Sequence, residues 1–224
     1  MAVNFEQYES ILKELTANQV KLIAVSKTKP NEDLQALYDF GQRAFGENYV
    51  QELVDKEASL PKDIQWHFIG HLQSNKVKYI APFVFMIHGV DSEKLLQEIN
   101  KQGVKQNRII DCLLQIHIAT EETKFGFDGH ALHELLVSGR VASYSNVRIR
   151  GLMGMASFSE DQTLLSKEFT LLKSYFDNAK RAFPGGHFDT LSMGMSSDYQ
   201  LAISKGSNMV RIGSLLFGAR NYSK

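Results

Sequence analysis

The chain has 224 residues, with 25 lysines and arginines against 25 aspartates and glutamates, and therefore no formal net charge at pH 7. A balanced charge gives no long-range attraction for nucleic acid or for an anionic membrane, so we expect neither as a partner. No apolar run approaches the ~18 residues that span a bilayer, and the polar N-terminus lacks the pattern of a signal peptide. These features predict a cytoplasmic protein. We expect a monomer with a single domain over residues 1–224.

Apolar, strand-like runs alternate with helical segments along the whole chain. An amphipathic helix is expected first, over 5–15, because its apolar residues fall on one face. Further helices are expected at 32–40, 49–59, 75–80, 91–102, 130–138, 161–183 and 197–205. Strands are expected at 21–26, 43–46, 65–69, 83–88, 111–119, 147–153, 188–192 and 208–212.

This alternation is typical of parallel strands that are covered by helices. Eight such repeats in a chain of this length favour a closed barrel over an open doubly wound sheet. The sequence therefore predicts the α/β class and a (β/α)₈ TIM-type barrel. The helix over 5–15 is additional, and it can supply the last helix of the outer ring.

The chain offers little for disulfide or metal chemistry. Its single cysteine, Cys112, lies in an apolar strand-like run, which predicts a buried and unreactive thiol. The histidines of the predicted strands have no spacing that is typical of a zinc site, so we expect structural histidines and no metal. They are His67, His71, His88 and His117.

The stretch Lys-Leu-Ile-Ala-Val-Ser-Lys-Thr-Lys-Pro at 21–30 places a lysine where a buried strand ends. Its apolar part, 22–25, has the pattern of a parallel strand buried on both faces, and Pro30 cannot continue the ladder. Desolvation lowers the pKa of a lysine, and a neutral amine can form an imine with an aldehyde. Lys27 is therefore a candidate for imine formation. Lys29 is expected on the same side, where repulsion between the two like charges would lower the Lys27 pKa further. The alternative is a strand-end lysine whose ammonium reaches water along its apolar stem.

Polar or glycine-rich segments follow most of the predicted strands, where a barrel of this kind forms its site. The segments Ser-Met-Gly-Met-Ser-Ser at 192–197 and Gly213-Ser214 follow the last two strands. They fit a phosphate cradle, because glycine lets backbone N–H groups approach an anion and serine adds hydroxyl donors. Ordinary capped turns show the same pattern, so both interpretations stay open. Arg211, near the end of the last strand, needs a carboxylate or a ligand if it is buried.

A reactive lysine, a phosphate cradle and an arginine together suggest one ligand. It would carry an aldehyde, a phosphate and an acceptor atom for the arginine, and pyridoxal 5′-phosphate has all three. The sequence contains neither a dinucleotide-binding glycine motif nor a nucleotide phosphate loop. Four methionines near strand ends fit either core fillers or the apolar wall of a pocket for a flat ligand. They are Met153, Met155, Met193 and Met195.

Several motifs, in order along most of the chain, closely resemble the pyridoxal phosphate homeostasis proteins. These proteins are single-domain relatives of the N-terminal barrel of alanine racemase. The segments are AVSKTKP at 24–30, FGENYVQE at 45–52, WHFIGHLQSNK at 66–76, GLMGM at 151–155, LSMGMS at 191–196, VRIG at 210–213 and FGAR at 217–220.

The resemblance implies a (β/α)₈ barrel that holds pyridoxal 5′-phosphate as an internal imine on Lys27, with Arg211 facing the pyridine nitrogen. Asn48 and Met153 match positions that line the ring, and Lys124 matches a loop lysine near the site. The implied phosphate contacts come from Ser192, Met193, Gly194, Gly213 and Ser214. The family has no established catalytic activity. Its implied role is to bind the cofactor and deliver it, with apoenzymes as possible partners, and so to balance vitamin B6 and amino-acid pools.

Two other functions stay open on the sequence. A pyridoxal phosphate-dependent amino-acid racemase would use the same barrel. The similar racemases, however, carry a second, β-rich domain with a catalytic tyrosine, and nothing follows Lys224 here, so we expect that base to be missing. A lysine-imine aldolase for a sugar phosphate would use Lys27 and the cradle without the cofactor. Such an imine does not absorb in the visible.

Overall fold

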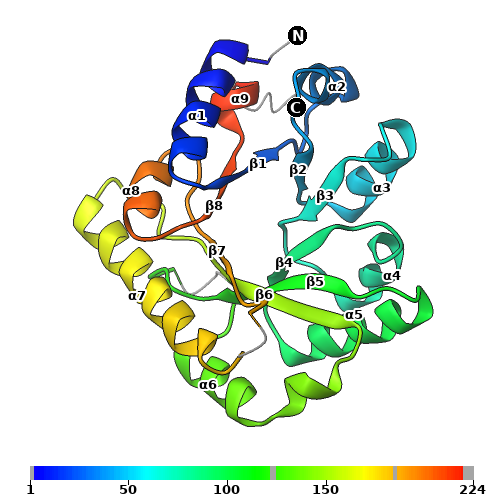
Figure 1. Ribbon diagram of the computed structural model, residues 1–224, viewed down its shortest axis with the longest axis vertical. Helices are drawn as coiled ribbons and strands as arrows, with labels where there is room; N and C mark the ends of the chain where they lie inside the picture. Colours follow the sequence, from blue (N-terminus) through cyan, green and yellow to red (C-terminus); the bar gives the residue numbers. More distant parts are fainter. Residues whose placement is uncertain (1–2, 122–124, 184–185, 219–224) are drawn as a thin grey trace.

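The computed structural model describes residues 3–121, 125–183 and 186–218 (Figure 1). Parallel strands close into a barrel in chain order from β1 to β8, and β8 pairs with β1. The strands are β1 Lys21–Val25, β2 Ala44–Glu47, β3 Gln65–Phe68, β4 Met86–Val90, β5 Ile110–Ile116, β6 Val147–Gly154, β7 Thr190–Ser192 and β8 Met209–Ile212. This arrangement confirms the predicted (β/α)₈ barrel.

Helices surround the strands on the outside (Figure 1). They are α1 Phe5–Ala17, α2 Asn31–Asp39, α3 Val50–Ser59, α4 Val77–Ile80, α5 Glu93–Lys105, α6 Gly129–Val137, α7 Gln162–Lys180, α8 Tyr199–Ser204 and α9 Ser214–Phe217, with 3₁₀ helices η1 Ser74–Lys76 and η2 Arg140–Ser143. The additional helix α1 lies beside α9, and the Asn4 N–H donates to the Leu216 carbonyl at 2.8 Å. No helix in the described ranges is both long and apolar enough to cross a membrane.

The fourth strand differs from its predicted position. It begins at Met86 rather than at 83, because the preceding residues form a turn that continues α4. The N–H groups of Phe83 and Val84 both donate to the Ile80 carbonyl, at 3.1 and 2.8 Å, so Phe83 is not free for a ladder. An apolar run alone does not distinguish such a turn from a strand start.

Apolar side chains fill both the space between strands and helices and the inside of the barrel. The interior cluster consists of Ile23, Met86, Leu113, Met153 and Met209. Cys112 is fully buried in the larger outer core, and burial raises the pKa of its thiol far above the ordinary value. The structure therefore confirms that the cysteine is buried, and a buried thiol with a raised pKa is expected to be inert.

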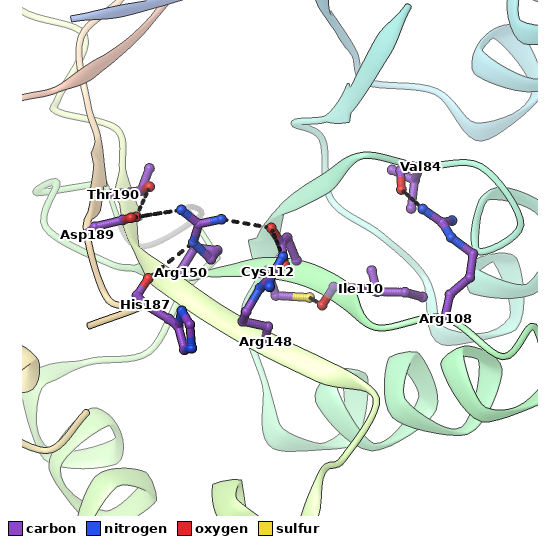
Figure 2. Close-up of polar contacts among 10 residues, drawn as sticks. Val84, Arg108, Ile110, Cys112, Arg148, Arg150, His187, Asp189 and Thr190 are labelled. Carbon is purple, nitrogen blue, oxygen red and sulfur yellow. Dashed lines mark hydrogen bonds and ion pairs between the residues drawn. The ribbon is translucent and has the colours of Figure 1, made fainter. Parts of the chain in front are cut away.

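Arginines and aspartates form an ion-pair network at the N-terminal ends of β5, β6 and β7 (Figure 2). Asp111 accepts from Arg148 Nε at 2.6 Å and from Arg150 Nη1 at 3.0 Å. Arg150 also binds Asp189, with an Nη2–Oδ2 distance of 2.8 Å. In such barrels this face contributes to stability, whereas the opposite face carries the site.

Candidate functional site

A pocket of about 390 Å³ opens at the C-terminal ends of the strands. Strand ends and the loops that follow them supply its walls, as expected for this fold. Its lining includes Lys27, Asn48, Met155, Arg211, Gly213 and Ser214. The pocket therefore brings together Lys27, Arg211 and part of the predicted cradle from distant parts of the chain.

Lys27 lies in a tight turn directly after β1. The Ser26 N–H donates to the Gly46 carbonyl at 3.0 Å, which ends the ladder, and the Lys29 N–H donates back to the Ser26 carbonyl at 3.1 Å. Thr28, at the centre of the turn, has φ +63°, in the left-handed region that a β-branched residue rarely adopts. Lys27 thus leaves the strand at a fixed point on the wall of the pocket.

Lys29 also lines the pocket, as expected for a residue on the same side as Lys27. Its ammonium donates to the carbonyls of Phe217 and Gly218, at 2.7 and 3.3 Å. Lys29 therefore connects the turn to the end of α9 through neutral oxygens.

Arg211 projects from β8 and is only 4% exposed. Its Nη1 donates to the hydroxyl of Ser192 at 2.6 Å and to the Ser192 carbonyl at 3.0 Å, and its Nη2 donates to the Gly154 carbonyl at 3.0 Å. Burial lowers the pKa of Arg211 to about 10, against a smaller opposite effect of Asp198. The guanidinium therefore stays charged at neutral pH, held by neutral oxygens at the edge of the pocket.

A column of buried polar side chains continues from Arg211 into the barrel. The Ser192 hydroxyl lies 3.5 Å from His88 Nδ1, and His88 Nε2 lies 2.9 Å from His67 Nδ1. Burial, with a smaller effect of Lys21, lowers the pKa of His67 to about 3, and burial likewise lowers that of His88 well below its usual range. Both histidines are therefore neutral and structural. Among the described residues, no group of His, Cys, Asp and Glu is arranged to hold a metal ion.

Gly213 and Ser214 lie in the pocket wall, where the cradle was predicted. The Gly213 N–H donates to the Ser196 hydroxyl at 3.2 Å, and Ser196 itself lines the pocket. A Cβ at Gly213 would lie 3.2 Å from Val25 on the neighbouring strand, so the wall approaches β1 closely at this point. The arrangement places Ser196 and Ser214 beside the pocket, and their hydroxyls are donors of the kind that an anion site uses, whereas the Gly213 N–H is already donated to Ser196.

The other three predicted phosphate contacts are not among the residues that line the pocket. Ser192 and Met193 are fully buried, with the Ser192 hydroxyl bound to Arg211. Gly194 has φ +98°, and a Cβ there would lie 2.7 Å from the Ala202 side chain, so the turn needs glycine. Their contacts with phosphate stay predictions.

The predicted ring contacts differ in their exposure to the pocket. Asn48 lines it, and its Oδ1 is buried with no hydrogen-bond partner among the described residues, so it is open to a donor from a ligand. Met153 is 1% exposed in the interior cluster, whereas Met155 lines the pocket. The sequence offered both methionines at one strand end, without a signal for which one reaches the pocket. Lys124 lies outside the described residues.

Comparisons with known proteins agree with this geometry. Residues 4–221 match the family described as "Alanine racemase, N-terminal domain", which defines the class of barrel. A "Pyridoxal phosphate homeostasis protein" of Pasteurella multocida (strain Pm70) is 41% identical over 210 residues, which cover 92% of this chain and 88% of that protein. The chain therefore belongs to the alanine racemase N-terminal domain family and, within it, to the pyridoxal phosphate homeostasis proteins.

Solved structures show the same relationship. PipY of Synechococcus elongatus PCC7942, in a structure with PLP bound, is 33% identical with a TM-score of 0.85, covering 95% of this chain and 99% of that one. Alanine racemase of Streptomyces coelicolor A3(2) is 14% identical with a TM-score of 0.72, covering 97% of this chain and 59% of that one. The second likeness concerns the fold alone.

Proposed function

We propose that this protein, as one barrel domain over residues 1–224, binds pyridoxal 5′-phosphate as an imine on Lys27 and delivers it without catalysing a reaction. The observation that carries the proposal is one pocket lined by Lys27, by Arg211 and by the loop residues Gly213 and Ser214. The relatives named pyridoxal phosphate homeostasis proteins and the PipY structure with PLP bound support the same ligand. The implied role is homeostasis of vitamin B6 and of amino-acid pools.

Each part of the pocket has a role that its chemistry suits. Lys27 would bond to the aldehyde, and Arg211 would donate to the pyridine nitrogen. Gly213 and Ser214 would hold the phosphate, together with Ser192, Met193 and Gly194. The ring would lie against Asn48 and Met153. The open acceptor of Asn48 fits a site that is completed by a ligand.

Arg211 explains why the bound cofactor would not promote reactions of amino acids such as transamination. Bound cofactor can act as an electron sink, and a protonated pyridine nitrogen strengthens that sink. An arginine donates a hydrogen bond and cannot accept a proton at neutral pH, so the nitrogen stays neutral and the sink stays weak. This disfavours transamination and decarboxylation.

Amino-acid racemisation is the alternative function. It needs a base on each face of the imine. Lys27 could serve one face, but no tyrosine lines the pocket within the described ranges, and the Lys29 ammonium is bound by two carbonyls. The likeness to alanine racemase, at 14% identity, does not extend beyond the fold. The geometry therefore favours binding.

Delivery of the cofactor implies recipient proteins and a location in the cell. We propose pyridoxal phosphate-dependent apoenzymes as the recipients, a monomer as the working form, and the cytoplasm as the location. The loaded protein, mixed with such an apoenzyme, should restore activity at least as fast as free cofactor at the same concentration. Slower recovery would contradict delivery.

The spectrum of the purified protein tests the binding proposal. After incubation with pyridoxal 5′-phosphate it should show a visible imine band, which the Lys27→Ala variant should lack and the exposed-site control Lys62→Ala should retain. Pyridoxal without phosphate should bind at least tenfold more weakly, because each charge-assisted bond is worth about 1.5–3 kcal/mol. A band in Lys27→Ala equal to that of the unaltered protein would contradict the proposal. A protein that forms an imine only with sugar phosphates would be the aldolase instead.

A further inference from the structure

A buried lysine of helix α3 lies directly behind the turn that carries Lys27. Lys56 is 4% exposed, and its ammonium donates to the Ser26 carbonyl at 2.8 Å, to Glu47 Oε1 at 2.8 Å and to Glu52 Oε1 at 2.7 Å. An ammonium group has three protons to donate, and three acceptors surround this one. We call Glu47, Glu52 and Lys56 the α3 cluster.

The α3 cluster contacts the residues on both sides of Lys27. On the N-terminal side, the Ser26 hydroxyl donates to Glu47 Oε1 at 2.6 Å, in addition to the bond between the Ser26 carbonyl and Lys56. On the C-terminal side, the Thr28 N–H donates to Glu52 Oε1 at 2.6 Å. The backbone is therefore held immediately before and immediately after the residue that faces the pocket.

Thr28 shows why the turn needs this support. Its φ of +63° is unfavourable for a β-branched residue and persists only where the surroundings impose it. A hydrogen bond from its N–H to an ionised carboxylate is stronger than a neutral one. Glu52 supplies that acceptor, and Lys56 holds Glu52 in place.

The composition of the α3 cluster does not suit a purely stabilising role. One ammonium faces two carboxylates, and Glu47 Oε2 is buried without a hydrogen-bond partner among the described residues. Burial raises the pKa of Glu47 to about 7, although Lys56 and Ser26 act in the opposite direction. Apolar side chains of similar volume often replace such buried ions without loss of stability. What apolar side chains cannot replace are the bonds to Ser26 and Thr28.

We propose that Lys56 is a positioning residue for Lys27. With Glu47 and Glu52, it fixes the peptide units on both sides of Lys27 and thereby the direction in which the Lys27 amine enters the pocket. The inference rests on the proposed imine at Lys27 and adds the groups that aim its amine. A reacting atom displaced by about 1 Å can lose on the order of 100-fold in rate, so such aiming matters.

The test measures the second-order rate constant for the appearance of the imine band, per folded protein, with pyridoxal 5′-phosphate as the probe. Lys56→Met removes the ammonium, and Lys62→Met breaks the exposed ion pair between Lys62 and Glu57 just beyond the same helix. We expect Lys56→Met to react about tenfold more slowly or worse, and Lys62→Met to stay within about twofold of the unaltered protein. A structural role alone would lower the melting temperature of Lys56→Met and leave this rate constant unchanged.

A second pair of variants keeps the proposal testable if Lys56→Met does not fold. The Glu52 side chain is 21% exposed, so Glu52→Ala removes the acceptor of the Thr28 N–H with little effect on packing, and Glu57→Ala is its control. We expect Glu52→Ala to react several-fold more slowly than Glu57→Ala. Equal rate constants, with the borohydride adduct on Lys27 in each variant, would overturn the positioning role and leave the proposed function intact. An adduct on another lysine in the unaltered protein would overturn both proposals.

Discussion

The barrel carries a charged cluster at each end, and the two differ in balance and burial. The N-terminal network pairs Arg148 and Arg150 with Asp111 and Asp189, so its formal charges cancel, and the Arg148 and Asp189 side chains are 43% and 47% exposed. It joins the starts of β5, β6 and β7 (Figure 2).

The α3 cluster has the opposite character. One lysine neutralises only one of two carboxylates, and the side chains of Glu47 and Lys56 are 0% and 5% exposed. Its hydrogen bonds hold the turn that presents Lys27 to the pocket. The comparison shows how this barrel separates two tasks. The balanced network at one end joins neighbouring strands, and in our proposal the unbalanced cluster at the other end positions Lys27.

The largest expected difference between the two clusters is in stability. Lys56→Met removes the ammonium that pairs with Glu47 and Glu52, and removal of one member of a buried ion pair costs about 3–5 kcal/mol. We expect a loss of that size in urea unfolding at pH 8 and a smaller loss at pH 6, where protonation of Glu47 relieves the charge. The double variant Glu47→Gln/Lys56→Met should recover much of the stability. A loss at pH 6 as large as at pH 8 would contradict the charge argument.

A change in the N-terminal network should separate stability from binding. Asp111→Asn weakens the bonds to Arg148 and Arg150, and we expect a loss of about 1–3 kcal/mol in the free energy of unfolding. Because this network lies at the opposite end from Lys27, the affinity for pyridoxal 5′-phosphate should change by less than about twofold, within the scatter expected for uncoupled distant sites. A calorimetric titration beside the unfolding curve checks both. A tenfold loss of affinity would show that the two ends are coupled.

The smallest expected difference between the two clusters is in how they make stability depend on pH. The α3 cluster and the N-terminal network should change stability in opposite directions as pH rises. Burial raises the folded-state pKa of Glu47 from 4.5 to about 7. Between these two pH values the folded protein binds a proton at Glu47 that the unfolded chain does not bind. The protein therefore loses stability as pH rises through this range. At the other end, burial raises the pKa of Asp189, but the hydrogen bonds from Arg150 and Thr190 and the charge of Arg150 together outweigh burial and lower this pKa from its ordinary value. The stability that Asp189 contributes is therefore present above its ordinary pKa and is lost as pH falls.

Glu47→Gln tests this assignment directly. Unfolding curves at pH 5, 6 and 7 should show a decline of about 1–3 kcal/mol in the unaltered protein, because each unit of pKa shift corresponds to about 1.4 kcal/mol. The decline should flatten in Glu47→Gln and persist in Asp189→Asn. An unchanged slope in Glu47→Gln would assign the effect to another group.

The barrel could be predicted from the sequence because its signals are local. Segments such as 22–25 are apolar on both faces and alternate with helical patterns, which specifies parallel strands without any knowledge of distant contacts. The start of β4 could not be predicted, because the bonds of Phe83 and Val84 to Ile80 decide it and an apolar pattern does not show them. Placement of Lys27, Arg211 and Ser214 around one pocket followed from their strand-end positions.

The α3 cluster could not be predicted for a physical reason. Glu52 and Lys56 stand four residues apart on a helix, which is the pattern of an ordinary solvent-exposed pair. Their burial depends on where α3 packs against β2, which brings Glu47 within 2.8 Å of Lys56. Likewise, spacing could not tell that Met155 lines the pocket while Met153 fills the barrel.

The central claim is that Lys27 holds pyridoxal 5′-phosphate, and chemical trapping tests it most directly. The loaded protein is reduced with borohydride, digested, and mapped by mass spectrometry. The account predicts that the reduced adduct lies mainly on the peptide containing Lys27 and that the Lys27→Ala variant loses it. An adduct mainly on Lys29, Lys124 or any other lysine of the unaltered protein would contradict the account.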